Sequence, residues 1–445
     1  MDPIANLITG TDFFLFFIYA IFGFLLMRYL VFRDATIISG PLLFWVYFIK
    51  LAGCALMCYL IVNYWKNGDA INYFTDGKAL GELIKQDVAN LRYLFLSAAD
   101  FQEKVNSDNY TTVSSIVVGE NNFVVSKFAA VFYLLSSGKF LIVNFFFCLF
   151  ATIGEFYLFI ALSKKYPSFK KQIAIGTLLM PSVLLYSSFM VKETLAMGVM
   201  GIVFYSLFQF FRKKRVVWHL IVILTGCLVI LWVKPYIIYA ILMAIVFSLL
   251  IRMMAYLMKK NIIIKGITIL SLLLVAYLFY NNMNAFNGYV VDFVDTANFF
   301  QNQYNSDFGE TSSFSIGEID PTVKGFIQKA PSGFFTTYFR PYIWEVDKPI
   351  ILFSAMESFA VLLLFFVVVF RNLFYIPKLF RSDFFILYTF VFVIVFGVIV
   401  GLTTFNFGTL IRYKIPAIPF LMLFIFHLKN HSFKRKEKEI QPVIQ

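Results

Sequence analysis

Long apolar segments recur from one end of this sequence to the other, and most of them are about as long as a helix that crosses a lipid bilayer. Inside a bilayer, each crossing segment must satisfy its own backbone hydrogen bonds, which a helix does. We therefore expect an all-α, polytopic integral membrane protein with about eleven transmembrane helices. The expected helices cover residues 12–32, 41–63, 138–163, 172–189, 194–211, 216–233, 236–258, 262–280, 350–370, 384–402 and 415–428.

Composition excludes a soluble fold. Of the 445 residues, 60% are hydrophobic and only 14% are charged, and the mean hydropathy is +0.79. Soluble domains carry about 25% charged residues. We expect residues 1–445 to form a single transmembrane domain, in which the 58 Phe and 25 Tyr side chains are spread over the apolar helices and need no single large core.

The net charge of +13 predicts an orientation rather than a nucleic-acid partner. Lys and Arg cluster in the connections between alternate apolar segments, as the positive-inside rule predicts for cytoplasmic loops. We therefore place the N-terminus outside and the C-terminus inside, with residues 429–445 as a basic cytoplasmic tail. The other basic connections contain Arg33, Lys164, Lys165, Lys170, Lys171, Arg212 to Arg215, Lys259, Lys260, Lys265, Arg371, Lys378 and Arg381.

Two long polar segments fall on the outward side in this arrangement, residues 64–137 and 281–349. The first includes a polar helical pattern, and the second ends on the aromatic run Phe334–Trp344. Loops of this length are usually functional when they are ordered. The sequence therefore directs the search for a site to the outer face.

Several common kinds of site have no support in the sequence. The four cysteines lie in apolar runs without a CxxC or Cys/His grouping, so we expect neither disulfides nor a zinc site. No P-loop, GxSxG or HExxH motif occurs. No basic region precedes the first apolar segment, so we expect no cleaved signal peptide. We expect no metal and no cofactor.

The first candidate site follows the second apolar segment. Asp69 lies there at the outward interface, where a lipid-linked substrate would present its polar head, and it could deprotonate an acceptor hydroxyl as a general base. Tyr73 follows four residues later and shares a helical face with Asp69, and Asp76 lies about one turn further on. The alternative is a helix N-terminus after Gly68 with an interfacial tyrosine.

The second candidate is the polar turn that ends the stretch Pro181–Glu193. Lys192 could neutralise a phosphate, and Glu193 could orient Lys192 or accept a proton. The alternative is an ion pair that these two residues form with each other at a helical hairpin.

The third candidate is a set of four outward cations beside Pro and Tyr: Lys234, Arg340, Arg412 and Lys414. Positive-inside bias depletes such residues on the outer face, so their recurrence indicates an anionic partner such as a lipid phosphate or pyrophosphate. Snorkelling toward headgroups is the alternative for each one alone. Glu155 and Glu357 lie inside apolar segments, where they either pair with a lysine or backbone group or form part of a relay.

Two of these motifs resemble a known superfamily. Gly68-Asp69-Ala70-Ile71-Asn72-Tyr73 is similar to the G-D-x-x-x-Y segment of the GT-C glycosyltransferases, and Arg412-Tyr413-Lys414-Ile415-Pro416-Ala417-Ile418-Pro419 is similar to their late R-Y-x-x-P-x-x-P pattern. The resemblance implies that Asp69 is the catalytic base and that Arg412 meets the lipid phosphate. The chain departs from the pattern because one extra helix precedes Asp69 and only Asp76 is left as a looser acidic partner.

The stretch Pro181–Glu193 also resembles a segment of bacterial envelope-polysaccharide membrane proteins, including relatives of O-antigen polymerases. Together these resemblances imply a membrane glycosyltransferase of the bacterial inner membrane. It would transfer a sugar from a polyprenyl-phosphate- or pyrophosphate-linked donor to a glycan acceptor in cell-envelope polysaccharide synthesis. An O-antigen or capsule repeat-unit polymerase is the first alternative. A lipid or solute transporter is the second, and it would favour charges deep in the membrane and broken helices.

Overall fold

The computed structural model describes residues 7–31, 37–107, 119–259, 313–346 and 349–440, together with scattered residues between 262 and 301. Within these residues every regular element is helical, apart from one isolated antiparallel bridge between Ser313 and Asn406. The predicted all-α class is therefore confirmed. Nine helices in the described part are long and apolar enough to cross a membrane. They are Gly10–Val31, Gly40–Trp65, Phe140–Lys165, Lys192–Phe211, Val216–Val233, Pro235–Leu257, Ile351–Ser382, Phe384–Thr403 and Phe407–Asn430.

Two of the eleven expected segments are missing from that set. Residues 262–280 lie mostly outside the described residues, so that expectation stays a prediction. Residues 172–189 are described, and they do not form the single continuous helix that we expected. The chain is thus a polytopic helical membrane protein whose exact number of crossings stays a prediction.

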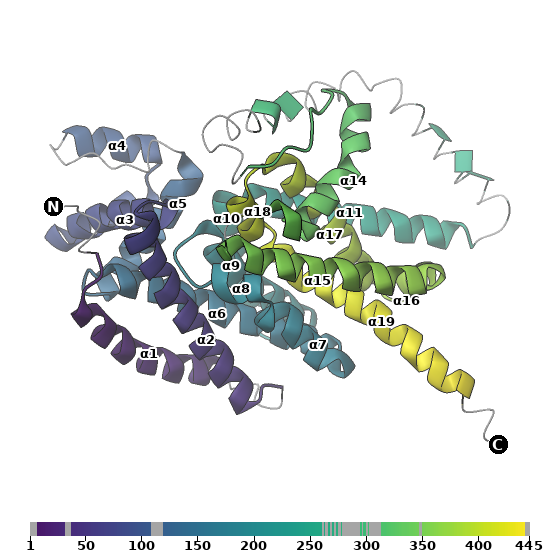
Figure 1. Ribbon diagram of the computed structural model, residues 1–445, viewed down its shortest axis with the longest axis horizontal. Coiled ribbons are helices and arrows are strands. Elements are labelled where there is room, and N and C mark those ends of the chain that lie inside the picture. The colour runs from purple at the N-terminus through teal and green to yellow at the C-terminus, as the bar shows by residue number, and fades with distance from the viewer. Residues whose placement is uncertain are drawn as a thin grey trace. The chain divides into compact units, whose positions relative to one another are not determined.

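Contacts divide the chain into two compact units, Met1–Ile238 (unit 1) and Tyr239–Gln445 (unit 2), which are described separately. Figure 1 labels their helices. Unit 1 contains α1 (Gly10–Val31), α2 (Gly40–Tyr59), α3 (Asp69–Gln86), α4 (Ala98–Ser107), α5 (Glu120–Leu135), α6 (Phe140–Lys165), α7 (Lys170–Ala174), α8 (Pro181–Tyr186), α9 (Lys192–Phe211) and α10 (Val216–Val233). Helix α11 (Pro235–Leu257) continues into unit 2, which also contains α14 (Val323–Phe339), α15 (Pro349–Asn372), α16 (Ile376–Ser382), α17 (Phe384–Thr403), α18 (Phe407–Tyr413) and α19 (Ile418–Ile440).

Helices α6 and α9 form the centre of unit 1 and run parallel to each other. Near their starts, the Met190 amide donates to Asn144 Oδ1 at 2.8 Å, and further along the rings of Tyr157 and Tyr205 lie 4.7 Å apart. Glycine allows the close approach between them, because a methyl group on Gly201 would lie 1.9 Å from the Gly154 carbonyl oxygen. Parallel neighbours require the chain between them to return along the length of α6.

That return path is the interrupted segment. It consists of α7, a π-helical turn at Ile175–Leu179, an extended residue at Met180 and the short helix α8. Pro181 explains the break, because proline disfavours helical conformation in the preceding residue and cannot donate a backbone hydrogen bond. After α8, the Ser188 hydroxyl bonds to the Leu185 carbonyl at 2.6 Å, which satisfies a group that a continuing helix would have used.

The directions of the helices give unit 1 two chemically different ends. Since α6 and α9 are parallel, their C-terminal residues lie at one end, which we call the basic end. It carries Lys164, Lys165, Lys170, Lys171, Arg212, Lys213, Lys214 and Arg215. The opposite end, which we call the polar end, contains the starts of α1, α6 and α9. Helix α2 is antiparallel to α6, because Lys50 contacts Glu155 and the later residue Cys54 contacts the earlier residue Cys148. Helix α2 therefore ends at the polar end.

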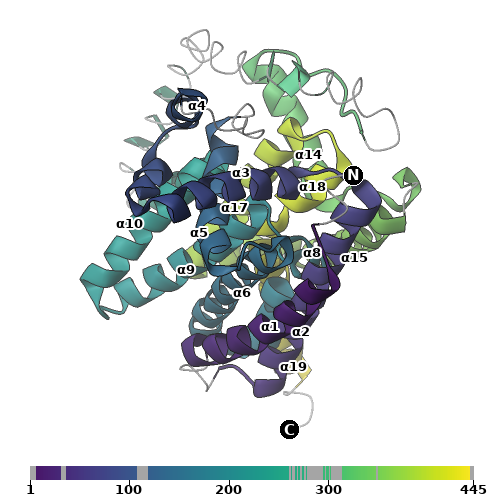
Figure 2. The ribbon, with the colours of Figure 1, turned by 90° about the vertical axis from the view of Figure 1, so that its left-hand side faces the viewer.

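Helices α3, α4 and α5 cover the polar end as a small folded layer, visible beside α1 and α2 in Figures 1 and 2. The layer has an apolar core of its own, which draws on all three helices and on the turn before α4. This core contains Leu80, Leu83, Ile84, Tyr93, Ala98, Phe101, Phe123 and Ala130. Glycine again permits a close helix contact, since a methyl group on Gly77 would lie 2.6 Å from the Ala129 side chain. The first long polar segment is therefore largely helical and packed over residues 69–107 and 120–135.

Unit 2 is built around the antiparallel pair α14 and α17. The Tyr338 hydroxyl donates to the Val393 carbonyl at 2.7 Å, and a methyl group on Gly401 would lie 1.9 Å from the Gly333 carbonyl oxygen. Helices α15 and α19 pack against each other and against this pair. The aromatic run predicted from the second polar segment forms the end of α14 and the 3-10 turn Ile343–Glu345 that follows it.

Candidate functional site

Asp69 is the first residue of α3 and its side chain is exposed. Gly68 precedes the helix with φ +136, a conformation that L side chains rarely adopt, and no atom lies within 4 Å of the position where a Cβ would stand. The membrane-length helix Gly40–Trp65 ends four residues before Asp69. The carboxylate thus lies at the polar end of unit 1, just beyond an apolar helix. Helix dipoles favour negative charge at this position.

The other two residues of the first candidate are buried in the packing of α3 against α5. Tyr73 is 3% exposed, and its hydroxyl donates to Asn122 Oδ1 at 2.9 Å. Asp76 is 1% exposed, and the Ser126 hydroxyl lies 3.4 Å from its Oδ2. Sequence spacing brings Asp69 and Tyr73 near each other along the helix, but only Asp69 reaches solvent. Asp76 and Tyr73 hold the layer together.

Glu193 forms an ion pair that the sequence did not suggest. Its Oε1 lies 2.7 Å from Lys234 Nζ, and both side chains are 2% exposed. Lys234 also donates to the Tyr236 hydroxyl at 3.1 Å. Because α9 and α10 are antiparallel neighbours, the start of one meets the end of the other at the polar end. Lys192, next to Glu193, is only half-buried and lies at the same end.

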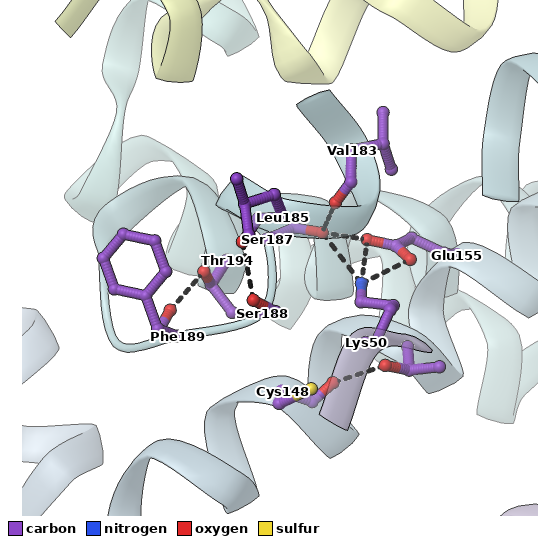
Figure 3. A network of polar contacts seen from close by, with 10 residues as sticks. Lys50, Cys148, Glu155, Val183, Leu185, Ser187, Ser188, Phe189 and Thr194 are labelled. Atoms are coloured by element: carbon purple, nitrogen blue, oxygen red, sulfur yellow. Dashed lines mark hydrogen bonds and ion pairs between the residues drawn. The ribbon is translucent and has the colours of Figure 1, made fainter. Parts of the chain in front are cut away.

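A buried polar cluster lies near the middle of α2 and α6 (Figure 3). The sequence pattern singled out Glu155 in this cluster but not Lys50 or Ser187. Lys50 Nζ lies 2.7 and 2.6 Å from the two carboxylate oxygens of Glu155 and 2.8 Å from the Ser187 hydroxyl. That hydroxyl lies 2.5 Å from both Glu155 Oε1 and the Val183 carbonyl oxygen. Both charged side chains are 0% exposed. The expected pairing of Glu155 with a lysine is confirmed, and Ser187 joins that pair to the interrupted segment.

In unit 2, Lys414 is fully enclosed between α15 and the end of α14. It is 1% exposed, and its Nζ lies 2.7 Å from the Ser358 hydroxyl and 3.4 Å from the Arg340 carbonyl oxygen. Glu357, 9% exposed, is close enough to interact with Lys414 electrostatically. This agrees with the expectation that Glu357 lies near a lysine. Lys414 therefore holds three elements together and is closed off from a large ligand.

Arg340 forms an ion pair with Glu345, with Nη2 2.6 Å from Oε1, and the two side chains are 19% and 18% exposed. Its guanidinium also lies 4.9 Å from the Phe314 ring and 5.6 Å from the Tyr342 ring. Arg412 is half-buried at the end of α18, and its Nε donates to the Gly408 carbonyl at 3.3 Å. Arg340 and Arg412 thus keep surface that a phosphate could reach, unlike Lys414.

The candidate residues fall into two sets that belong to different units. Asp69, Tyr73, Asp76, Lys192, Glu193 and Lys234 are in unit 1, and Arg340, Arg412 and Lys414 are in unit 2. Within unit 1, all six lie at the polar end. Within unit 2, Arg340 and Lys414 are joined through the Arg340 carbonyl, and Phe314 stacks on Phe407 at the start of the helix that carries Arg412.

Groups in the α3–α5 layer show how its electrostatics are arranged. The Tyr133 hydroxyl donates to Glu82, and this hydrogen bond, together with Lys85, holds the pKa of the Glu82 carboxyl below its usual value. Lys127 is half-buried and donates to the Leu96 carbonyl at 2.7 Å, and burial lowers the pKa of its amine. Neither group points to chemistry beyond the packing of the layer.

Sequence reasoning missed Lys50, Ser187, Ser358 and Glu345. Lys50 carried a usable signal, since a charged residue inside an apolar segment is costly and indicates a buried partner. The others carried none, because serine and an interfacial glutamate are ordinary in such positions. In the described part of the chain, no group of three or more His, Cys, Asp or Glu side chains is placed to hold a metal ion.

No protein-family model, curated protein or solved structure matches this chain.

Proposed function

We propose that the protein is a membrane glycosyltransferase that transfers a sugar from a polyprenyl-phosphate- or pyrophosphate-linked donor to a glycan acceptor. The observation that carries this proposal is the placement of Asp69. An exposed carboxylate begins a packed polar helix four residues after a membrane-length helix ends. A substrate anchored in the bilayer presents its polar head at the same depth.

In the proposed reaction, Asp69 accepts the proton of the acceptor hydroxyl while that oxygen attacks the anomeric carbon of the donor sugar. The bond between the anomeric carbon and the phosphate oxygen breaks, and the lipid phosphate leaves with the bonding electron pair. Cations stabilise that developing charge. Lys192, half-buried at the same end of unit 1 as Asp69, could take this role, and within unit 2 Arg412 and Arg340 keep partly accessible guanidinium groups that could bind a phosphate. Attack from the face opposite the phosphate inverts the anomeric centre.

The proposal includes an orientation, with the polar end of unit 1 outside, the N-terminus outside and the C-terminus inside. It is supported by the eight Lys and Arg residues that the parallel helices α6 and α9 bring to the basic end. Cytoplasmic loops carry such an excess of positive charge. A bacterial inner membrane, in which lipid-linked sugars supply envelope polysaccharide synthesis, fits this arrangement.

Two other functions are each favoured by a particular observation. A repeat-unit polymerase, in which both substrates are lipid-linked, is favoured by the partly exposed Arg340 and Arg412 of unit 2. A transporter is favoured by the interrupted segment between α6 and α9 and by the buried Lys50–Glu155 pair beside it. Discontinuous helices and buried charges at mid-membrane are typical of transporter binding sites.

The test is to replace Asp69 by Asn and Arg412 by Ala in cells that lack the native copy, and to determine the masses of lipid-linked glycans and surface polysaccharide. Asp100→Asn is the matched control, because Asp100 is an exposed carboxylate on α4 of the same layer. Loss of one sugar from the repeat in both variants, with Asp100→Asn normal, supports the transferase. Intact single repeats without chains in the Arg412 variant support the polymerase. Unchanged glycans in well-expressed variants leave transport as the remaining proposal.

A further inference from the structure

Five flat groups of unit 2 form a continuous series of contacts, which we call the stack. Phe407 stacks on Phe314 with ring centroids 4.9 Å apart and planes 26° apart. The Arg340 guanidinium lies 4.9 Å from Phe314 and 5.6 Å from Tyr342. Tyr342 stacks on Trp344 with centroids 5.0 Å apart and planes 18° apart. The stack runs from the start of α18 to an indole at its outer end.

The outer end of the stack is held in a fixed position by Glu345. One carboxylate oxygen accepts from Arg340 at 2.6 Å, and the other accepts from the Tyr342 backbone amide at 3.0 Å. These two hydrogen bonds fix the 3-10 turn Ile343–Glu345. The stacked rings of Tyr342 and Trp344 are carried by this turn and the residue before it. Burial raises the pKa of the Tyr342 hydroxyl, so that ring stays neutral.

Trp344 itself is 75% exposed although it ends an ordered stack. One face of the indole rests on Tyr342, and the other has no ring packed on it in the described part of the chain. In the same turn, Glu345 keeps 18% of its side-chain surface exposed, and its partner Arg340 keeps 19%. Because Glu345 follows Trp344 in the chain, a partly exposed hydrogen-bond acceptor lies one residue from an aromatic face that is open to a ligand.

We propose that Trp344 is a stacking platform for a pyranose ring, with the carboxylate of Glu345 as a hydrogen-bond acceptor for its hydroxyl groups and Arg340 as a residue that positions the platform. The proposal deepens the proposed function, on which it rests, by assigning a sugar subsite in unit 2.

The chemistry of the two surfaces matches. An aromatic face carries negative charge from its quadrupole, and the aligned C–H bonds on one side of a pyranose carry partial positive charge. Sugar hydroxyls lie around the ring edge, where they can donate to a carboxylate. A platform that is already ordered loses little conformational freedom when a ligand binds.

The competing explanation is a tryptophan that anchors the protein among lipid headgroups, since Trp and Tyr are enriched at both membrane interfaces. An anchor needs only an indole at the right depth. It does not need a ring aligned on a second ring, a guanidinium below that ring and a carboxylate that fixes the turn. This ordered support favours a ligand whose binding depends on the orientation of the indole face.

The experiment measures saturation transfer by NMR from the full-length protein in nanodiscs to free methyl β-glucopyranoside, methyl β-galactopyranoside, methyl α-mannopyranoside and N-acetylglucosamine. We expect at least one pyranoside to receive saturation mainly at the C–H protons of one ring face. In Trp344→Ala this transfer should fall roughly five-fold, as expected for loss of a stacking contact. Trp218→Ala is the matched control, because Trp218 is 62% exposed on α10 and should leave the transfer unchanged.

Trp344→Phe keeps a flat ring and should retain an intermediate signal, which separates loss of the platform from misfolding. A variant that keeps Trp344 and replaces the other four of the five Trp residues by Phe reports its depth through quenching by brominated lipids. Strong quenching without any transfer to a pyranoside would mean a lipid anchor and would overturn the proposal. Transfer that survives in Trp344→Ala, or transfer to uridine in place of every pyranoside, would also overturn it.

These outcomes are separate from those of the proposed function. Asp69→Asn should bind pyranosides as the native protein does, because binding needs no proton transfer. If pyranoside binding depends on Trp344 but Asp69→Asn leaves the glycans unchanged, the platform stands and the transferase fails. If glycan synthesis depends on Asp69 but no pyranoside binds, the reverse holds.

Discussion

Lys50 and Glu155 form a salt bridge with both side chains 0% exposed and with Nζ 2.6 Å from Oε2. They come from near the middle of two membrane-length helices and are joined by the hydroxyl of Ser187, the first residue after α8. A buried pair of this kind stabilises little by itself, because the cost of desolvating two charges offsets their attraction. Breaking it leaves one charge without compensation.

We therefore predict that Lys50→Met or Glu155→Leu alone destabilises the protein by about 3–5 kcal/mol. The double variant Lys50→Met/Glu155→Leu should recover most of that loss, because no buried charge remains. Thermal unfolding of the purified protein in detergent measures both effects. Lys85→Ala is the control, since its ion pair with Glu82 is exposed and its loss should change the stability by less than about 1 kcal/mol. Single and double variants of equal stability would contradict the prediction.

Gly201→Ala should destabilise unit 1 by about 1–3 kcal/mol, the usual effect of overpacking. The added methyl group would lie 1.9 Å from the Gly154 carbonyl oxygen, so α6 and α9 would have to separate. Gly40→Ala is the matched control, because nothing lies within 4 Å of its Cβ position. Equal unfolding temperatures for the two variants would show that the helices do not cross at this glycine.

Arg340→Lys should loosen the turn that carries Trp344 although the positive charge is kept. Lysine has no planar group to pack on Phe314 and Tyr342, and it lacks the fork that reaches Glu345. The fluorescence anisotropy of Trp344, measured in the variant that keeps only this tryptophan, should fall. Lys324→Arg, at an exposed position on α14, should leave the anisotropy as it was. Unchanged anisotropy in Arg340→Lys would mean that the guanidinium does not support the platform.

The hydrogen bond from Tyr133 to Glu82 should stabilise the α3–α5 layer in a way that depends on pH. The folded pKa of Glu82 is lower than its ordinary value of 4.5, so this stabilisation is present above pH 4.5 and is lost as the pH falls through the folded value. Tyr133→Phe removes the hydrogen bond. The difference in unfolding temperature between the native protein and this variant should therefore shrink from about pH 7 to about pH 3. A difference that stays constant over that range would contradict the assignment.

Much of the fold could be predicted from hydrophobic pattern alone. Each long apolar run outside residues 172–189 that the structure describes forms a helix close to its expected bounds. The reason is local, since a segment in lipid has only its own backbone to satisfy its hydrogen bonds. The same pattern could not predict the interruption at Met180. It depends on Pro181 and on serine side chains that compete for backbone carbonyls within an otherwise apolar run.

For the candidate residues too, the sequence predicted some features and not others. The sequence marked Asp69, Glu193 and Lys234 as unusual for their positions, and it marked Glu155 as a charge in need of a partner. It could not assign those partners, because residues 41 to 105 positions apart are brought together only when helices pack. Glu193 pairs with Lys234, which lies 41 positions later in the chain, because antiparallel α9 and α10 place them at one end.

What the sequence by itself determined is the solvent of this protein, its helical class and the separation of basic from polar connections. These follow from the composition and length of single segments. Only the tertiary structure decided that α6 and α9 run parallel, that Lys50 and Ser187 enclose Glu155, and that Trp344 ends a stack of five groups. Each of these depends on side chains from different helices meeting at contact distance, and no property of one segment encodes which surfaces will meet.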